Sequence, residues 1–74
     1  MKIEIYYCAP WNFDLPAAGL AQELKKTLGV QAELIEGSSG IFDVIVDGKR
    51  LYSRSETGRL PEPEEIIHKL KAPS

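Results

Sequence analysis

The sequence has only one cysteine, Cys8, in 74 residues. A single cysteine cannot form an internal disulfide, so no framework of bridges stabilises this fold. The sequence also has no apolar run near the roughly 20 residues that a membrane-spanning helix needs. It has no basic run, and its net charge is −2. A surface that neutralises nucleic-acid phosphates is therefore not expected.

Two further absences concern location and metal chemistry. The chain enters a strand-like segment at once, without the basic and apolar regions of a signal peptide, and its KAPS ending carries no lipidation signal. Histidine, cysteine and carboxylate residues are nowhere grouped at metal-ligand spacing. We therefore expect one small cytoplasmic domain, residues 1–74, without a metal site, a nucleic-acid partner or a membrane partner. The sequence leaves its oligomeric state open.

What the sequence does contain is an alternation of strand-like and helix-like segments. We expect strands starting at residue 3 and over 30–36, 41–46 and 49–53, and helices from 15 or 16 to 28 and over 61–71. Leu20, Leu24 and Leu28 recur every four residues and predict the buried stripe of the first helix. Asp47–Gly48 is a strong hairpin signal. The order β-α-β-β-β-α predicts an α+β, two-layer, thioredoxin-like fold, with a mixed sheet and both helices on one face.

Several finer expectations concern single positions in these elements. Asp14 is a good N-cap for the first helix. Gly19 lies inside that helix, where glycine costs about 1 kcal/mol relative to alanine, so we interpret it as a point of close helix–sheet approach. The alternation over residues 30–34 predicts that Leu34 faces inward. Residues 54–59 are polar and are expected to form a loop.

The candidate site is the connection between the first strand and the first helix, which contains Cys8. Backbone N–H groups and the helix dipole favour a negative charge at such a place, which suits a reactive thiol. We therefore expect an accessible thiol in a loop. The alternative is that Cys8 serves only as a small buried hydrophobic residue. Trp11 and Phe13, beside Pro10, either anchor a partner protein or fold over the sheet edge.

Three motifs are distinctive: Cys8 directly after the first strand, G-x-F-x-V-x-V-D-G at 40–48 and S-R-x-x-x-G-R-x-P at 53–61. With these motifs, the chain resembles the selenoprotein W-like (Rdx) proteins over nearly its whole length. The resemblance implies a small thioredoxin-like domain with a thiol-redox or glutathione-linked role. Members usually carry a second cysteine or a selenocysteine three residues after the first. That position is Trp11 in this chain.

This departure limits the chemistry to be expected. A dithiol enzyme uses its second thiol to release the mixed disulfide formed by the first, so dithiol oxidoreductase activity is not expected here. The first hypothesis is a monothiol that forms a mixed disulfide through Cys8 with glutathione or a thiol-bearing partner protein. Glutathione would be a co-substrate, and no resident cofactor is expected.

The competing hypothesis is a non-catalytic module that binds another protein through the loop from Cys8 to Phe13. The turn Gly37–Gly40 lies where thioredoxins place a proline against the active site, so its serines are expected to line the same edge. The candidate partner-binding residues are Pro10, Trp11, Phe13, Ser38 and Ser39.

Overall fold

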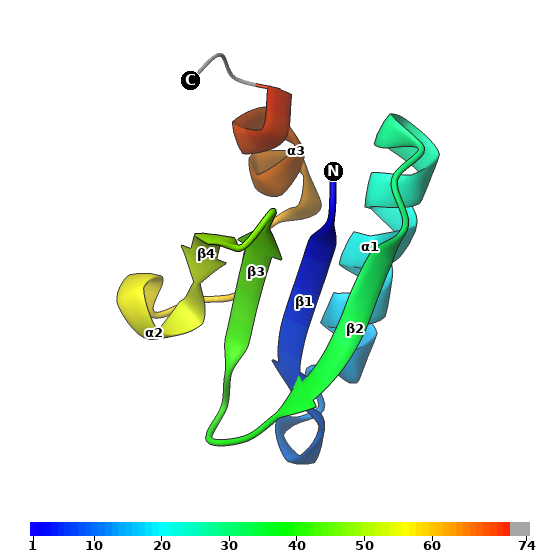
Figure 1. The fold of residues 1–74 in the computed structure, drawn as a ribbon. Helices are drawn as coiled ribbons and strands as arrows, with labels where there is room; N and C mark the ends of the chain where they lie inside the picture. The colour runs from blue at the N-terminus through cyan, green and yellow to red at the C-terminus, as the bar shows by residue number, and fades with distance from the viewer. Residues whose placement is uncertain (72–74) are drawn as a thin grey trace.

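The computed structural model describes residues 1–71 and forms one four-stranded sheet covered by helices (Figure 1). The elements are β1 (Ile3–Cys8), the 3₁₀ turn η1 (Ala9–Trp11), α1 (Asp14–Leu28), β2 (Ala32–Gly37), β3 (Phe42–Val46), β4 (Lys49–Ser53), α2 (Arg54–Thr57) and α3 (Pro63–Lys71). The strand order across the sheet is β2-β1-β3-β4. β1 runs parallel to β2, whereas the β1–β3 and β3–β4 pairs are antiparallel. The predicted α+β mixed sheet is therefore confirmed.

The strand β1 is an inner strand of the sheet, with β2 on one side and β3 on the other. Its alternate residues Ile3 and Ile5 are buried in the core. Ile5 is in register with Leu34 of β2 on one side and Val44 of β3 on the other. The predicted turn after β3 is also present, and Asp47 and Gly48 both adopt positive φ, 50° and 82°. These are the values that a tight hairpin requires at its two central positions.

One core holds the sheet and the two longer helices together. Its buried members are Ile3, Ile5, Ala17, Leu20, Leu24, Phe42, Val44, Tyr52 and Ile66. The helix α1 packs on β1 and β2, and α3 packs against α1 and β4. Because α1 and α3 contribute to the same cluster, both cover the same face of the sheet, as predicted.

Several predicted boundaries are wrong: β2 begins at Ala32 and not at residue 30, β3 at Phe42 and not at 41, and α3 at Pro63 and not at 61. The N-cap of α1 is Phe13, and Asp14 is the first helical residue without a side-chain capping bond. The turn closes early because the Phe13 N–H donates to the carbonyl of Cys8 at 3.1 Å. Residues 54–57, expected in a loop, form the short helix α2, which ends where the Gly58 N–H donates to the carbonyl of Arg54 at 2.7 Å.

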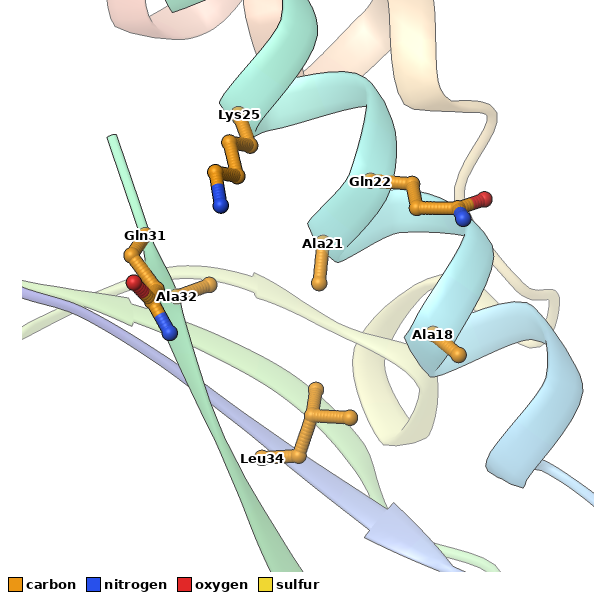
Figure 2. Close-up of a pocket in the computed structure, with 7 residues that line it drawn as sticks. All are labelled: Ala18, Ala21, Gln22, Lys25, Gln31, Ala32 and Leu34. Carbon is orange, nitrogen blue, oxygen red and sulfur yellow. The ribbon is translucent and has the colours of Figure 1, made fainter. Parts of the chain in front are cut away.

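One prediction about packing is wrong, and a second is right in direction but not in burial. A Cβ atom added to Gly19 would meet nothing within 4 Å, so this glycine does not mark a close approach to the sheet. Leu34 lies on the side of the sheet that faces α1, but its side chain stays 40% exposed. Among the α1 residues that line the hollow beside Leu34, Ala18 and Ala21 have short side chains that do not cover it (Figure 2).

Candidate functional site

The connection from β1 to α1 is short and internally hydrogen-bonded. The strand ends at Cys8, which has extended backbone angles, and the turn Ala9–Trp11 follows directly. Asn12 closes this turn in the left-handed conformation, with φ of 62°, and its N–H donates to the carbonyl of Ala9 at 2.9 Å. The cysteine is therefore fixed between the end of a strand and the beginning of a helix, as the sequence predicted.

The expectation of an accessible thiol in a loop is wrong. Cys8 is the last residue of β1, and only 1% of its surface is exposed. The thiol is a free cysteine, and it is not part of the core cluster under the helices. Strand alternation places Cys8 on the same face as Tyr6, away from Ile5 and the helices.

The turn between β2 and β3 covers this strand end. Cys8 is in register with Gly37 of β2. A Cβ atom at Gly37 would lie only 2.6 Å from Cγ2 of Ile41, so the Ile41 side chain occupies the space over that glycine. Registered residues on neighbouring strands project to the same face of a sheet. Ile41 therefore fills the space beside the Cys8 side chain.

Trp11 packs against the same turn. A Cβ atom at Gly40 would lie 2.7 Å from Cζ3 of Trp11, so the six-membered part of the indole rests directly on the Gly40 backbone. Gly40 has φ of 71°, a second reason why this position favours glycine. Trp11 nevertheless remains 52% exposed. The side chain folds over the sheet edge, as one of the two predicted alternatives has it. It also presents indole surface to solvent, which the other alternative, a partner-binding anchor, requires.

Arg54, the first residue of α2, directly follows the edge strand β4 and contacts the loop that contains Trp11. Its guanidinium carbon lies 5.3 Å from the ring centres of both Trp11 and Phe13, within the range of a cation–π contact. Its Nη1 atom donates to the carbonyl of Gly40 at 3.5 Å. Phe13 in turn makes an edge contact with Phe42 of the core, with ring centres 6.2 Å apart. The sequence does not predict Arg54 as a site residue, although Arg54 lies in the S-R-x-x-x-G-R-x-P motif.

The remaining predicted binding residues lie around this cluster. Pro10, Ser38 and Ser39 are exposed, whereas Phe13 is partly buried. The carbonyl of Ser38 accepts the Ile41 N–H at 3.2 Å, and Ser39 adopts a positive φ of 58°. The loop from Cys8 to Phe13 and the turn Gly37–Gly40 were predicted to line the same edge of the sheet. They meet where Trp11 contacts Gly40.

Within residues 1–71, the side chains whose pKa values are clearly shifted, Arg59 and Glu65, lie outside this site, in the connection to α3 and in α3 itself. Arg59 donates two hydrogen bonds to the carboxylate of Glu65, at 2.9 and 2.8 Å. These bonds lower the pKa of Glu65 and raise the pKa of Arg59. The carbonyl of Arg59 also accepts the hydroxyl of Tyr52 at 2.7 Å. This network ties β4 to α3 and is structural.

The network predicts an acid-dependent component of stability. Because folding lowers the pKa of Glu65, the pair stabilises the fold fully above the ordinary value of 4.5, and this contribution is lost as the pH falls through the lowered pKa. In urea unfolding at low salt, Glu65→Gln should be less stable than the parent at neutral pH. The difference should shrink in acid and in about 1 M salt.

The control for this measurement is Glu56→Gln, which removes the exposed ion pair between Glu56 and Arg50. Exposed pairs contribute little to stability, so its effect should be smaller than that of Glu65→Gln. A stability difference for Glu65→Gln that stays constant down to strongly acidic pH would show that the carboxylate charge is not what stabilises this connection.

A hollow of about 220 Å³ lies between α1 and the edge strand β2 (Figure 2). Its floor and walls are Ala18, Ala21, Ala32 and Leu34, and Lys25 lies at its rim. Cys8 does not line this hollow, because the thiol lies at the other end of β1, beside Gly37. The hollow is therefore separate from the candidate site.

Over residues 1–71, no group of three or more histidine, cysteine or carboxylate residues is placed to hold a metal ion. None of the helices in the same part of the chain combines the length and apolar character needed to cross a membrane. The chemistry that the candidate site offers is that of one thiol beside an aromatic and cationic cluster.

A family model and two solved structures all relate this chain to the selenoprotein W-like proteins. The model of the Rdx family matches residues 2–72. The crystal structure of a selenoprotein W-related protein from Vibrio cholerae has a TM-score of 0.88 and 30% identity, over 95% of this chain and 91% of that one. A protein from Bordetella parapertussis has a TM-score of 0.89 and 32% identity, over 95% and 92% of the two chains. The predicted thioredoxin-like fold of the selenoprotein W type is thereby confirmed.

The curated relatives are longer than this chain. Migration and invasion enhancer 1 of Bos taurus is 27% identical over 75 residues, and the Mus musculus protein of the same name is 26% identical over 75 residues. Each match covers 100% of this chain but 65% of the relative. About a third of those relatives therefore has no counterpart here.

Proposed function

This chain belongs to the Rdx family, a thioredoxin-like, redox-associated family, and we propose on that premise that it acts as a monothiol through Cys8. The observation that carries the proposal is the position of this thiol. It lies at the C-terminal end of β1, directly before the turn that leads into α1, where the family carries its redox cysteine. Trp11 stands at the second redox position, and the sequence has no other cysteine.

The proposed reaction is thiol–disulfide exchange. The Cys8 thiol gives up its proton, and the thiolate attacks one sulfur of glutathione disulfide or of a disulfide on a partner protein. A new S–S bond forms to Cys8 as the old one breaks, and the other sulfur leaves as a thiolate that takes up a proton. Cys8 is thereby oxidised and the leaving sulfur is reduced. No second thiol is present to eject the adduct, so an external thiol must release it.

Burial of Cys8 means that this reaction needs a local opening, and we assign the opening to residues 38–41. Two polar contacts hold this turn in place: the Ile41 N–H to the Ser38 carbonyl at 3.2 Å, and Arg54 to the Gly40 carbonyl at 3.5 Å. Trp11 also packs on Gly40, but this turn lies outside the strands and has few backbone hydrogen bonds, and such segments open more readily than core strands. Lifting the turn would move Ile41 away from the strand end and expose the sulfur.

The proposal predicts a stable adduct with glutathione. Incubation of the folded protein with oxidised glutathione should add one glutathione per chain, and only an added reductant should remove it. Intact-mass spectrometry measures the adduct, and Cys8→Ser is the control that should show none. The proposal fails if the parent protein remains unmodified after prolonged incubation while a denatured sample reacts.

A second candidate function is protein recognition by the loop from Cys8 to Phe13. The supporting observation is exposed apolar surface: Trp11 is 52% exposed, and Leu15, the second residue of α1, is 77% exposed. A pull-down with the parent protein, Cys8→Ser and Trp11→Ala separates the two functions. Partners lost with Cys8→Ser are linked through the thiol, whereas those lost only with Trp11→Ala are recognised by the surface.

We further propose that glutathione serves as a co-substrate and that the protein works in the cytoplasm. A single unpaired thiol fits a compartment in which glutathione and thioredoxin keep thiols reduced. In such a compartment the same pool would also supply the external thiol that releases the adduct.

A further inference from the structure

A groove of about 440 Å³ lies between α1 and the segment that leads into α3, and neither proposed function uses it. Its apolar lining consists of Pro16, Gly19, Leu20, Leu60, Pro61 and Pro63. The three prolines are only partly buried, and so is Leu60. Leu20 belongs to the buried core, so the groove is an open surface whose base reaches the core and whose prolines remain partly exposed.

Gly19 helps to keep this groove open. It lies in the interior of α1, where glycine costs about 1 kcal/mol relative to alanine. Its φ is not positive, and a Cβ atom there would meet nothing within 4 Å. Neither backbone conformation nor packing therefore requires glycine at this position. What its missing side chain does provide is space on the α1 wall of the groove.

The polar atoms around the groove mostly accept hydrogen bonds. Proline has no N–H group, so three of the lining residues offer no backbone donor. Glu23 and Glu62 contribute exposed carboxylates, and within residues 1–71 neither forms an ion pair. Gln22 has the one lining side chain that can donate a hydrogen bond. A complementary ligand must therefore bring an apolar part, a positive charge and its own donors.

We propose that this groove binds an arginine side chain from a basic segment of a partner protein. The methylene stem of arginine packs on apolar surface while its head stays polar, which matches the proline and leucine walls beside Gly19. The guanidinium pairs with the carboxylates of Glu23 and Glu62. Arginine suits this site better than lysine because its planar group binds carboxylates through two hydrogen bonds and is more weakly hydrated.

The test is an NMR titration of the isotope-labelled full chain with the capped tripeptide acetyl-Ala-Arg-Ala-amide. Amide shifts should concentrate at Gly19, Glu23 and Glu62. Replacing arginine by its neutral isostere citrulline should weaken binding at least about tenfold, since charge-assisted hydrogen bonds are lost. Replacing it by lysine should weaken binding to a smaller extent.

Variants of the protein separate binding from stability. Gly19→Leu should preserve or raise the melting temperature, because leucine is a far better helix former than glycine, yet it should weaken the peptide about tenfold by filling the groove. Thr27→Leu adds the same side chain at an exposed position of α1 outside the groove and should leave binding unchanged. Glu23→Gln and Glu62→Gln should each weaken binding, whereas Glu33→Gln on β2 should not.

Equal binding of the citrulline peptide, or undiminished binding by folded Gly19→Leu, would overturn the proposal. Equal binding of the lysine peptide would overturn the choice of arginine as the ligand. An absence of shifts in the groove up to several millimolar peptide would overturn the site itself. Each of these results is independent of Cys8, so the monothiol proposal stands or falls separately.

Discussion

Leu24→Ala should lower the free energy of unfolding by about 2–5 kcal/mol, the usual range for a buried leucine. Leu24 is completely buried in the single core that α1 shares with the sheet. A domain of this size has a net stability of only a few kcal/mol, so the variant should be substantially unfolded at room temperature. Urea denaturation followed by circular dichroism measures the loss.

The matched control for Leu24→Ala is Leu15→Ala in the same helix. Leu15 is 77% exposed, so its truncation should change the free energy of unfolding by no more than about 0.5 kcal/mol. If Leu24→Ala also changed stability by no more than about 0.5 kcal/mol, the helix register described here would be wrong.

Trp11→Cys should convert the protein from a stable monothiol into one that closes an internal disulfide. Position 11 lies in the turn Ala9–Trp11 directly after Cys8, and residues three apart in a tight turn have Cα atoms within about 7 Å, close enough for a disulfide. Under mild oxidation the variant should form this bond. It should also lose its glutathione adduct, because the new thiol attacks the mixed disulfide. Free-thiol counting and intact-mass spectrometry measure both results.

This variant must first be shown to fold, because it loses the indole that rests on Gly40. Trp11 is half exposed, so we expect the loss to cost about 1–3 kcal/mol, less than for a buried tryptophan. Trp11→Ala is the control for that loss, since it removes the indole without adding a thiol. A folded Trp11→Cys protein that keeps both thiols free under oxidant would contradict the proposed loop geometry. The protein-recognition function would then be favoured.

The fold could largely be predicted because its signals are local and repeat along the chain. Alternation in β1, leucines at helical spacing in α1 and Asp47–Gly48 each specify one element, and together they leave few topologies. The helix α2 could not be predicted because it has no apolar stripe. Its last residue, Thr57, donates its hydroxyl to the Tyr52 hydroxyl at 2.8 Å, a contact that exists only after β4 has formed.

The site could be located from the sequence, but its exposure could not. The position of Cys8 between strand and helix followed from the local pattern. Its burial depends on Ile41, which returns to the strand end only through the pairing of β1 with β2 and β3. The cluster of Arg54 with Trp11 likewise joins residues far apart in sequence. A single sequence carries no direct signal for contacts of this kind.

In the proposed mechanism, Cys8 reacts from the folded protein by local opening. The most direct test is the rate at which oxidised glutathione modifies Cys8 in a urea series below the unfolding transition. Lifting a four-residue turn exposes little surface, so we predict a rate that hardly changes with urea. A rate that rises with the full urea dependence of global unfolding would contradict this mechanism. Cys8 would then react only in unfolded chains and would be a structural residue.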